Sequence, residues 1–252
     1  MSIWMGLFLG IIQGLTEFLP VSSSGHLILF QHFLNLPSDM LFFNIILHLA
    51  TLLAVVIVFR KTIWQLVRHP FNKLNLYLVI STAITCGLVV LFKEYIDKTF
   101  TYKILPITFL VTAIILFTTT FVTNNDKAHE VTGPAATVVG VAQFFAVTPG
   151  LSRSGTTIST LLFTGVKREK AADYSFLMSI PVIIASFLYE LLDVGTAPAF
   201  DVWPTIAAFI AAVISGILAI KFMLRIIQNV KLHWFSLYLV ILAIVCGILF
   251  YV

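Results

Sequence analysis

Two short polar stretches in this 252-residue chain contain residue types that bind and transfer phosphate. The first, QGLTEFLPVSSSGH at 13–26, combines an acid, three consecutive serines and a histidine. The second, TPGLSRSGTT at 148–157, has an arginine and five hydroxyl side chains but no acid. Arginine offers a planar fork of donors that suits phosphate oxygens, and a serine beside a base can act as a nucleophile. The two stretches together predict a site for a phosphate group.

Arg153 is the most informative residue of the second stretch. An arginine at membrane depth costs about 2.5–3.5 kcal/mol on insertion scales, so its presence there indicates a role in anion binding. Ser152, Ser154 and Thr157 add hydroxyl donors, and a helix predicted to begin near Gly155 adds free N–H groups and the positive end of its dipole. Three simpler interpretations stay open. The arginine side chain could extend to the membrane–water interface, it could pair with a distant acid, and Ser154 could be a helix cap.

The first stretch places Gln13 and Glu17 on one helix face, because they are four residues apart. Glu17 is the only acid in the first 38 residues. An unpaired carboxylate in an apolar run is costly, so Glu17 is protonated, paired with Arg153 or bound to a cation. His26 follows the three serines, where it can orient or deprotonate a serine or protonate a leaving oxygen.

The elements that position these residues are membrane helices. The chain is 60% hydrophobic and 10% charged, with a mean hydropathy of +1.04, which indicates a polytopic membrane protein. The net charge of +4 is too small to indicate a nucleic-acid partner. Crossing a bilayer takes about 20 apolar residues. Six stretches approach that length and predict an all-α fold with six transmembrane helices: 41–59, 75–92, 104–122, 174–192, 203–222 and 234–252.

Both polar stretches interrupt apolar runs that are too short to cross. The runs at 3–19 and 135–147 are stopped by proline, glycine and serine, and a second short run follows each break, to about 36 and over 156–165. The pattern predicts two re-entrant helix–break–helix loops, which are allowed at membrane depth when protein or water satisfies their backbone.

The two breaks also resemble each other. Residues 10–25 match residues 140–155 at an offset of 130, with glycine, glutamine and glycine in equivalent places. Three full spans follow each break, so the halves are expected to insert with opposite orientation, as an inverted-topology repeat whose broken helices meet near the midplane. The chain is therefore predicted to be a single membrane domain, 1–252, with pseudo-repeats at about 1–122 and 131–252.

Basic residues predict the orientation. Loops on one side carry ten Lys and Arg residues and loops on the other carry three, so the first side is expected in the cytoplasm and both termini outside. Alanine, serine and glycine recur at helical spacing over 207–219 and predict a face for close helix packing, which leaves a homodimer possible. The ten residues are Arg60, Lys61, Arg68, Lys73, Lys127, Lys167, Arg168, Lys170, Arg225 and Lys231.

The motifs at 13–26 and 149–157, with YSFLMSIPV at 174–182, resemble those of the undecaprenyl-diphosphate phosphatase family, the bacitracin-resistance type. That family has Glu or Gln, three residues, Glu, then a serine-rich turn ending in Gly-His. The resemblance implies hydrolysis of the terminal phosphate of undecaprenyl diphosphate. This reaction recycles the lipid carrier of cell-wall synthesis in the bacterial plasma (inner) membrane.

The resemblance also implies roles for single residues. Glu17, His26 and Arg153 would be essential, and Ser23 would be the nucleophile, with Ser22 and Ser24 as the next candidates. A divalent cation, Mg²⁺ or Ca²⁺, would lie on Glu17 with Gln13. Many family members have Glu at the position of Gln13, which weakens its role as a charged ligand. A water activated by the cation stays open as the nucleophile. The implied phosphate-binding residues are Ser152, Arg153, Ser154 and Thr157.

A transporter or flippase of an anionic polyprenyl lipid is the alternative function, because inverted repeats with broken helices are a transporter plan. Transport needs a binding site but no nucleophile. Release of phosphate by the purified protein therefore distinguishes the two functions.

Overall fold

The computed structural model describes residues 1–37, 40–99, 101–122, 128–193, 201–228 and 232–251, and this part of the chain is helical with no β-strand. Six helical stretches within it are long and apolar enough to cross a membrane, as the sequence predicts. They are α3 Leu41–Val58, α5 Lys73–Leu91, the stretch Tyr102–Phe121 that contains α7 Leu105–Thr118, α10 Arg168–Asp193, α11 Val202–Ile226 and α12 His233–Tyr251. The protein is therefore a multi-pass membrane protein. The predicted start of α10 was six residues too late, because Arg168 and its polar neighbours form the first turns of the helix.

The two interrupted regions form pairs of short helices. The first pair is α1 Ile3–Phe18 and α2 Ser23–Phe33, and the second is α8 Gly133–Phe145 and α9 Arg153–Phe163. None reaches the length of about 20 residues that a crossing helix needs. Two further short helices, α4 Arg60–Arg68 and α6 Lys93–Asp97, lie between spans.

Helix boundaries in the two halves follow the offset of the sequence match. The helices α2 and α9 are both 11 residues long and begin 130 residues apart. Their N-cap serines each accept the N–H of the glycine three residues later, Ser22 from Gly25 and Ser152 from Gly155. Helix pairing corresponds as well: α1 packs on α11 as α8 packs on α5, and α7 packs on α12.

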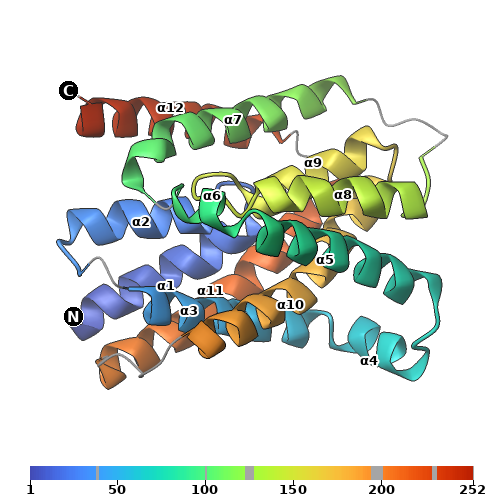
Figure 1. Cartoon of the computed structure of the whole chain (residues 1–252), viewed down its shortest axis with the longest axis horizontal. Coiled ribbons are helices and arrows are strands. Elements are labelled where there is room, and N and C mark those ends of the chain that lie inside the picture. Colours follow the sequence, from blue (N-terminus) through green and yellow to red (C-terminus); the bar gives the residue numbers. More distant parts are fainter. Residues whose placement is uncertain (38–39, 100, 123–127, 194–200, 229–231, 252) are drawn as a thin grey trace.

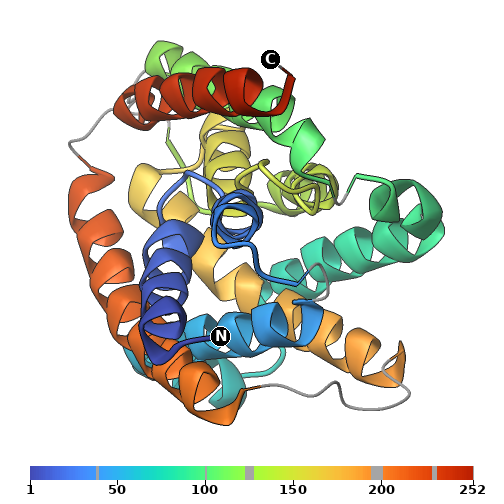
Figure 2. The same ribbon diagram turned by 90° about the vertical axis from the view of Figure 1, so that its left-hand side faces the viewer.

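The two pairs of short helices begin at opposite ends of the molecule. In Figure 1 both termini lie at the left, whereas α4 and the start of α8 lie at the right. Seen from the end that holds the termini, α1 and α2 lie inside a ring of the longer helices (Figure 2). Lys127 and Lys231, on which the predicted orientation partly rests, are outside the described residues.

Close packing against α11 fixes the position of α1. A Cβ atom added at Gly6, Gly10 or Gly14 would lie within 2.5 Å of a carbonyl oxygen of α11, so only glycine allows this approach. The small-residue face of α11 is thus buried against α1 within the chain. A homodimer, if formed, uses another surface. The carbonyl groups in question belong to Pro204, Ala208 and Ala212.

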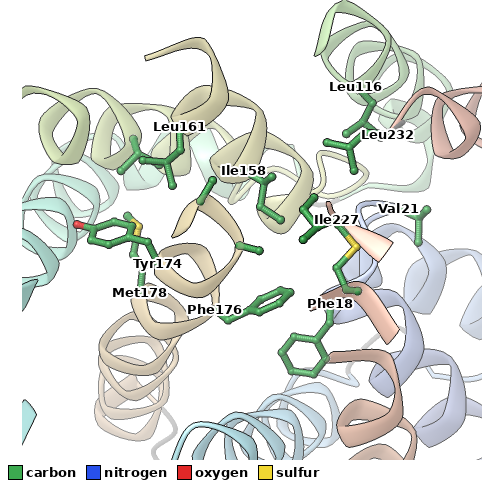
Figure 3. Packing of buried hydrophobic residues seen from close by; sticks show 14 of the residues in the cluster. Phe18, Val21, Leu116, Ile158, Leu161, Tyr174, Phe176, Met178, Ile227 and Leu232 are labelled. Atoms are coloured by element: carbon green, nitrogen blue, oxygen red, sulfur yellow. The ribbon is translucent and has the colours of Figure 1, made fainter. Parts of the chain in front are cut away.

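An apolar cluster holds the two short pairs together at the centre. Phe18 at the end of α1 packs edge-on against Phe176 of α10, with ring centroids 5.6 Å apart. Ile158 of α9 belongs to the same cluster (Figure 3). All three side chains are fully buried. Because Phe18 follows Glu17 and Ile158 lies one turn beyond Arg153, this cluster sets the distance between the two polar stretches.

Candidate functional site

The two polar stretches meet at Glu17. Its Oε1 accepts an ion-paired hydrogen bond from Nη2 of Arg153, a residue 136 positions away in the chain. Its Oε2 accepts from Ser23 Oγ at 2.5 Å and from Gln13 Nε2 at 3.1 Å, and His48 Nδ1 lies 3.5 Å from it. The carboxylate is buried, so hydrogen bonds and the guanidinium replace its lost hydration. Of the three states predicted for Glu17, the structure has the pair with Arg153.

Arg153 has a donor group that its pairing with Glu17 does not use. Its side chain is 16% exposed, and Nη2 is used by Glu17. Its Nη1 is buried and has no hydrogen-bond partner. A buried guanidinium N–H without an acceptor is costly, so an anion that reached this nitrogen would be bound with a charge-assisted hydrogen bond. Both nitrogens together allow Arg153 to hold Glu17 and a phosphate oxygen at once.

The backbones of the two breaks are in direct contact. A Cβ added at Gly25 would lie 2.9 Å from the Cα of Gly150, and one added at Gly155 would lie 3.2 Å from Cβ of Pro20. Ser154 Oγ donates to Leu19 O at 3.1 Å. These contacts fix the position of Arg153 relative to Glu17 from both sides, as the sequence match predicts.

Helix α7 holds the backbone of the second break through Thr112, a contact that the sequence does not indicate. Thr112 Oγ1 accepts the N–H of Ser152 at 3.1 Å and donates to the carbonyl of Gly150 at 3.0 Å. Gly150 has φ +86°, a conformation that favours glycine. Threonine is common in apolar spans, so only the fold distinguishes Thr112 from its neighbours.

The first break presents Ser23 to Glu17 through an unusual backbone. Ser22 has φ 68°, a left-handed conformation that is costly for a residue with a side chain. Its Oγ caps α2 by accepting from Gly25 N and lies 3.3 Å from Ser24 Oγ. The tight turn lets α2 begin at Ser23, so that the hydroxyl of this residue, and not those of Ser22 or Ser24, contacts the carboxylate.

His26 does not touch the hydroxyl of Ser23. Its Nδ1 lies 2.7 Å from the carbonyl oxygen of Ser22, and its Nε2 lies 2.7 Å from the hydroxyl of Tyr238 on α12. The Ser23 hydroxyl is therefore in contact with Glu17, and His26 lies one helical turn further along α2. Tyr238 was missed because it lies in an apolar span 212 residues away and no local pattern connects it to the motif.

Three hydroxyl residues of the second break use their side chains within the protein. Ser152, not Ser154, is the N-cap, and the helix begins at Arg153 and not near Gly155 as predicted. Thr157 Oγ1 lies 2.6 Å from Ser175 Oγ and donates to the carbonyl of Arg153 at 2.8 Å. These groups position the arginine in this structure, and their contact with phosphate stays a prediction.

Gln13 and His48 complete the surroundings of Glu17. Gln13 Nε2 lies 3.2 Å from His48 Nδ1, a hydrogen-bonding contact between α1 and α3. Gln13 Oε1 is buried without a partner. Among the described residues no group of three or more His, Cys, Asp or Glu side chains can hold a metal ion. The residues available to a hard cation are one carboxylate and this free amide oxygen.

Known proteins are similar in sequence to this chain over nearly its whole length. A family model described as bacitracin resistance protein BacA matches residues 6–245. A protein of Carboxydothermus hydrogenoformans named undecaprenyl-diphosphatase is 40% identical over 250 residues, which cover 97% of this chain and 96% of that protein. A protein of the same name from Treponema denticola is 38% identical, and the match covers 100% of this chain and 98% of that protein. A third, from Korarchaeum cryptofilum, is also 38% identical, over 97% of this chain and 98% of that protein.

Proposed function

This chain belongs to the bacitracin resistance protein BacA family, and we propose that it hydrolyses the terminal phosphate of undecaprenyl diphosphate. The products are undecaprenyl phosphate and inorganic phosphate, so the reaction returns a lipid carrier for cell-wall synthesis. The proposal rests on one observation. The Ser23 hydroxyl donates a hydrogen bond to a carboxylate that is paired with Arg153, and Arg153 has a donor without a partner. A carrier or flippase needs no such serine–carboxylate contact.

In the first step, Ser23 attacks the terminal phosphorus. Its proton passes to Glu17 Oε2 as the Oγ–P bond forms, and the bond from phosphorus to the bridging oxygen breaks. Undecaprenyl phosphate leaves with the electron pair of that bond. Nη1 of Arg153 binds an oxygen of the transferred phosphoryl group and stabilises the negative charge of that group in the transition state.

In the second step, water releases the enzyme. Its oxygen bonds to phosphorus, its proton passes to His26, and the P–O bond to Ser23 breaks. The serine oxygen takes back the proton that Glu17 holds. The proton on His26 then returns to solvent. Ser23 and His26 are three residues apart in α2 and so share a helix face, which favours His26 as the base for this water.

We also propose that α1–α2 and α8–α9 are re-entrant loops of an inverted-topology repeat in the bacterial plasma membrane, with both termini outside. The corresponding helix boundaries and pairings in the two halves support the repeat. The lengths of the short helices support loops that turn back. In this arrangement the lipid chain lies among the spans and the diphosphate reaches the two breaks.

A divalent cation fits this site when the substrate is present. Glu17 and the free Oε1 of Gln13 are suitable oxygen ligands, but Mg²⁺ and Ca²⁺ take six or more ligands. We propose that Glu17 and Gln13 hold the cation and that diphosphate oxygens and water provide its other ligands. Such an ion would neutralise charge on the diphosphate and favour departure of the lipid phosphate.

The decisive experiment measures phosphate release from a polyprenyl diphosphate by purified protein in detergent. We expect Ser23→Ala to lower release by roughly three orders of magnitude. Ser24→Ala, which removes a neighbouring hydroxyl bonded only to Ser22 Oγ, should keep release within a few-fold of the parent. Mass spectrometry of the quenched wild-type reaction should find phosphate on Ser23.

Two other results would change the proposal. Release that survives Ser23→Ala but is lost in Arg153→Ala would show that water, not serine, is the nucleophile. Binding of the lipid without any phosphate release by the wild-type protein would favour the carrier.

A further inference from the structure

The His26 ring is hydrogen-bonded through both of its nitrogens. Nδ1 lies 2.7 Å from the Ser22 carbonyl oxygen, which has no hydrogen to offer. Nδ1 must therefore carry the hydrogen and donate it. In the neutral ring Nε2 then has a lone pair, and the hydroxyl of Tyr238, 2.7 Å away, donates to it. The Ser22 carbonyl thus fixes the hydrogen on Nδ1, and the Tyr238 hydroxyl occupies the Nε2 lone pair of the neutral ring.

Packing holds the ring in the plane that this hydrogen bond needs. The His26 and Tyr238 rings are stacked, with an interplanar angle of 9° and centroids 5.9 Å apart. Phe109 of α7 packs edge-on against the imidazole at 5.6 Å. Since α7 and α12 pack against each other, the two aromatic rings form one wall beside the start of α2.

Tyr238 separates a buried histidine from the outside of the helix bundle. His26 is 2% exposed, whereas Tyr238 is 43% exposed. Ser22, Tyr238, Phe109 and Phe30 are the neighbours of the imidazole in the described part of the chain, and no carboxylate or cation there is paired with it. The tyrosine hydroxyl is thus the one titratable group that faces Nε2 among the described residues.

We propose that Tyr238 relays a proton in the hydrolysis and acts through His26. In the second step its oxygen takes the proton of the attacking water while its own hydroxyl proton passes to Nε2, so the tyrosine stays neutral and the histidine becomes charged. The inference rests on the proposed function, but it concerns the histidine and not the identity of the nucleophile.

The test compares Tyr238→Phe with Tyr251→Phe. The first variant removes the hydroxyl and keeps the ring that stacks on His26. The second removes a hydroxyl of the same helix that donates to the Lys103 carbonyl, also at 2.7 Å, and lies far from His26 in the chain. We expect Tyr238→Phe to lower kcat about 3- to 10-fold with KM within about twofold, the scale of one lost hydrogen bond. Tyr251→Phe should leave both constants within about twofold.

The pH profile separates a role at His26 from simple destabilisation. The Tyr238 oxygen also accepts from protonated Nε2, and this charge-assisted contact is stronger than the one to the neutral ring, so its loss should move the acid limb of the kcat profile to lower pH in Tyr238→Phe only. An unchanged or faster Tyr238→Phe enzyme would overturn the proposal, as would the same loss in Tyr251→Phe.

A spectroscopic measurement tests the contact without turnover. In protein labelled with ¹⁵N-histidine, the Nε2 signal of His26, identified by its absence in His26→Gln, should move downfield in Tyr238→Phe and stay in place in Tyr251→Phe. No movement in either variant would refute the hydrogen bond. If Ser23→Ala kept its activity, the serine route would fail while the Tyr238 comparison would still stand, because water must be deprotonated on either route.

Discussion

The substitution Glu17→Gln tests the centre of the site, because it keeps the shape of the side chain and removes its charge. In the parent, one carboxylate oxygen accepts the hydrogen bond of Ser23 and the other binds Arg153. A glutamine amide can still occupy this space, but it cannot accept a proton from serine. It also leaves the guanidinium of Arg153 without a counter-charge in a mostly buried position.

Two magnitudes follow from these contacts. Loss of a general base typically costs about 10²- to 10⁴-fold in rate, so phosphate release should fall into that range. Breaking a buried ion pair by removing one partner costs about 3–5 kcal/mol, because it leaves an uncompensated charge. Arg153 is 16% exposed and part of its charge can be hydrated, so we expect about 3 kcal/mol.

The double variant Glu17→Gln/Arg153→Met separates the two effects. Methionine keeps an unbranched side chain and has no charge, so the double variant should recover most of the lost stability while its phosphate release stays at background. The assays are thermal unfolding in one detergent at fixed lipid content and phosphate release at saturating substrate.

The reasoning is refuted if Glu17→Gln keeps more than about a tenth of the parent rate, since a general base contributes more than that. It is equally refuted if the double variant is no more stable than Glu17→Gln. In that case the single variant loses stability for a reason other than the unpaired guanidinium.

Two further predictions concern the cation and the second break. Gln13→Glu places a second carboxylate beside Glu17, so the free Mg²⁺ concentration for half-maximal phosphate release should fall by about tenfold, and no change would argue against a cation at this position. Gly150→Ala forces a side chain onto φ +86° and puts its Cβ 1.9 Å from a threonine hydroxyl of α7, so it should lower the unfolding temperature and the activity together. Gly87→Ala is its control, because a Cβ there meets no atom within 4 Å, and equal losses in both variants would contradict the packing argument.

The spans and the breaks could be predicted from the sequence because both depend on local composition. A helix crosses the bilayer when about 20 successive residues are apolar, and six helical stretches of the structure meet that condition where expected. Proline, glycine and serine stop a helix through their own backbone preferences, so the ends of α1 and α8 could also be predicted from the sequence.

The candidates Glu17 and Arg153 also followed from the sequence, since each is an isolated charge within an apolar region and needs a partner. Their contact was inferred from the match between the two breaks, and the structure has it. The choice among Ser22, Ser23 and Ser24 rested on resemblance alone. The positive φ of Ser22 favours Ser23, because that turn directs the hydroxyl of Ser23 to the carboxylate.

The surroundings of these residues came only from the tertiary structure. Hydropathy does not distinguish Tyr238 from the other aromatic residues of the last span, nor Thr112 from the other threonines of α7. Each acquires its role from a hydrogen bond to a segment tens to hundreds of residues away, and the packing of helices, not local preference, determines which side chains meet. The sequence by itself determined which residues needed partners, and the packed bundle decided which partners they have.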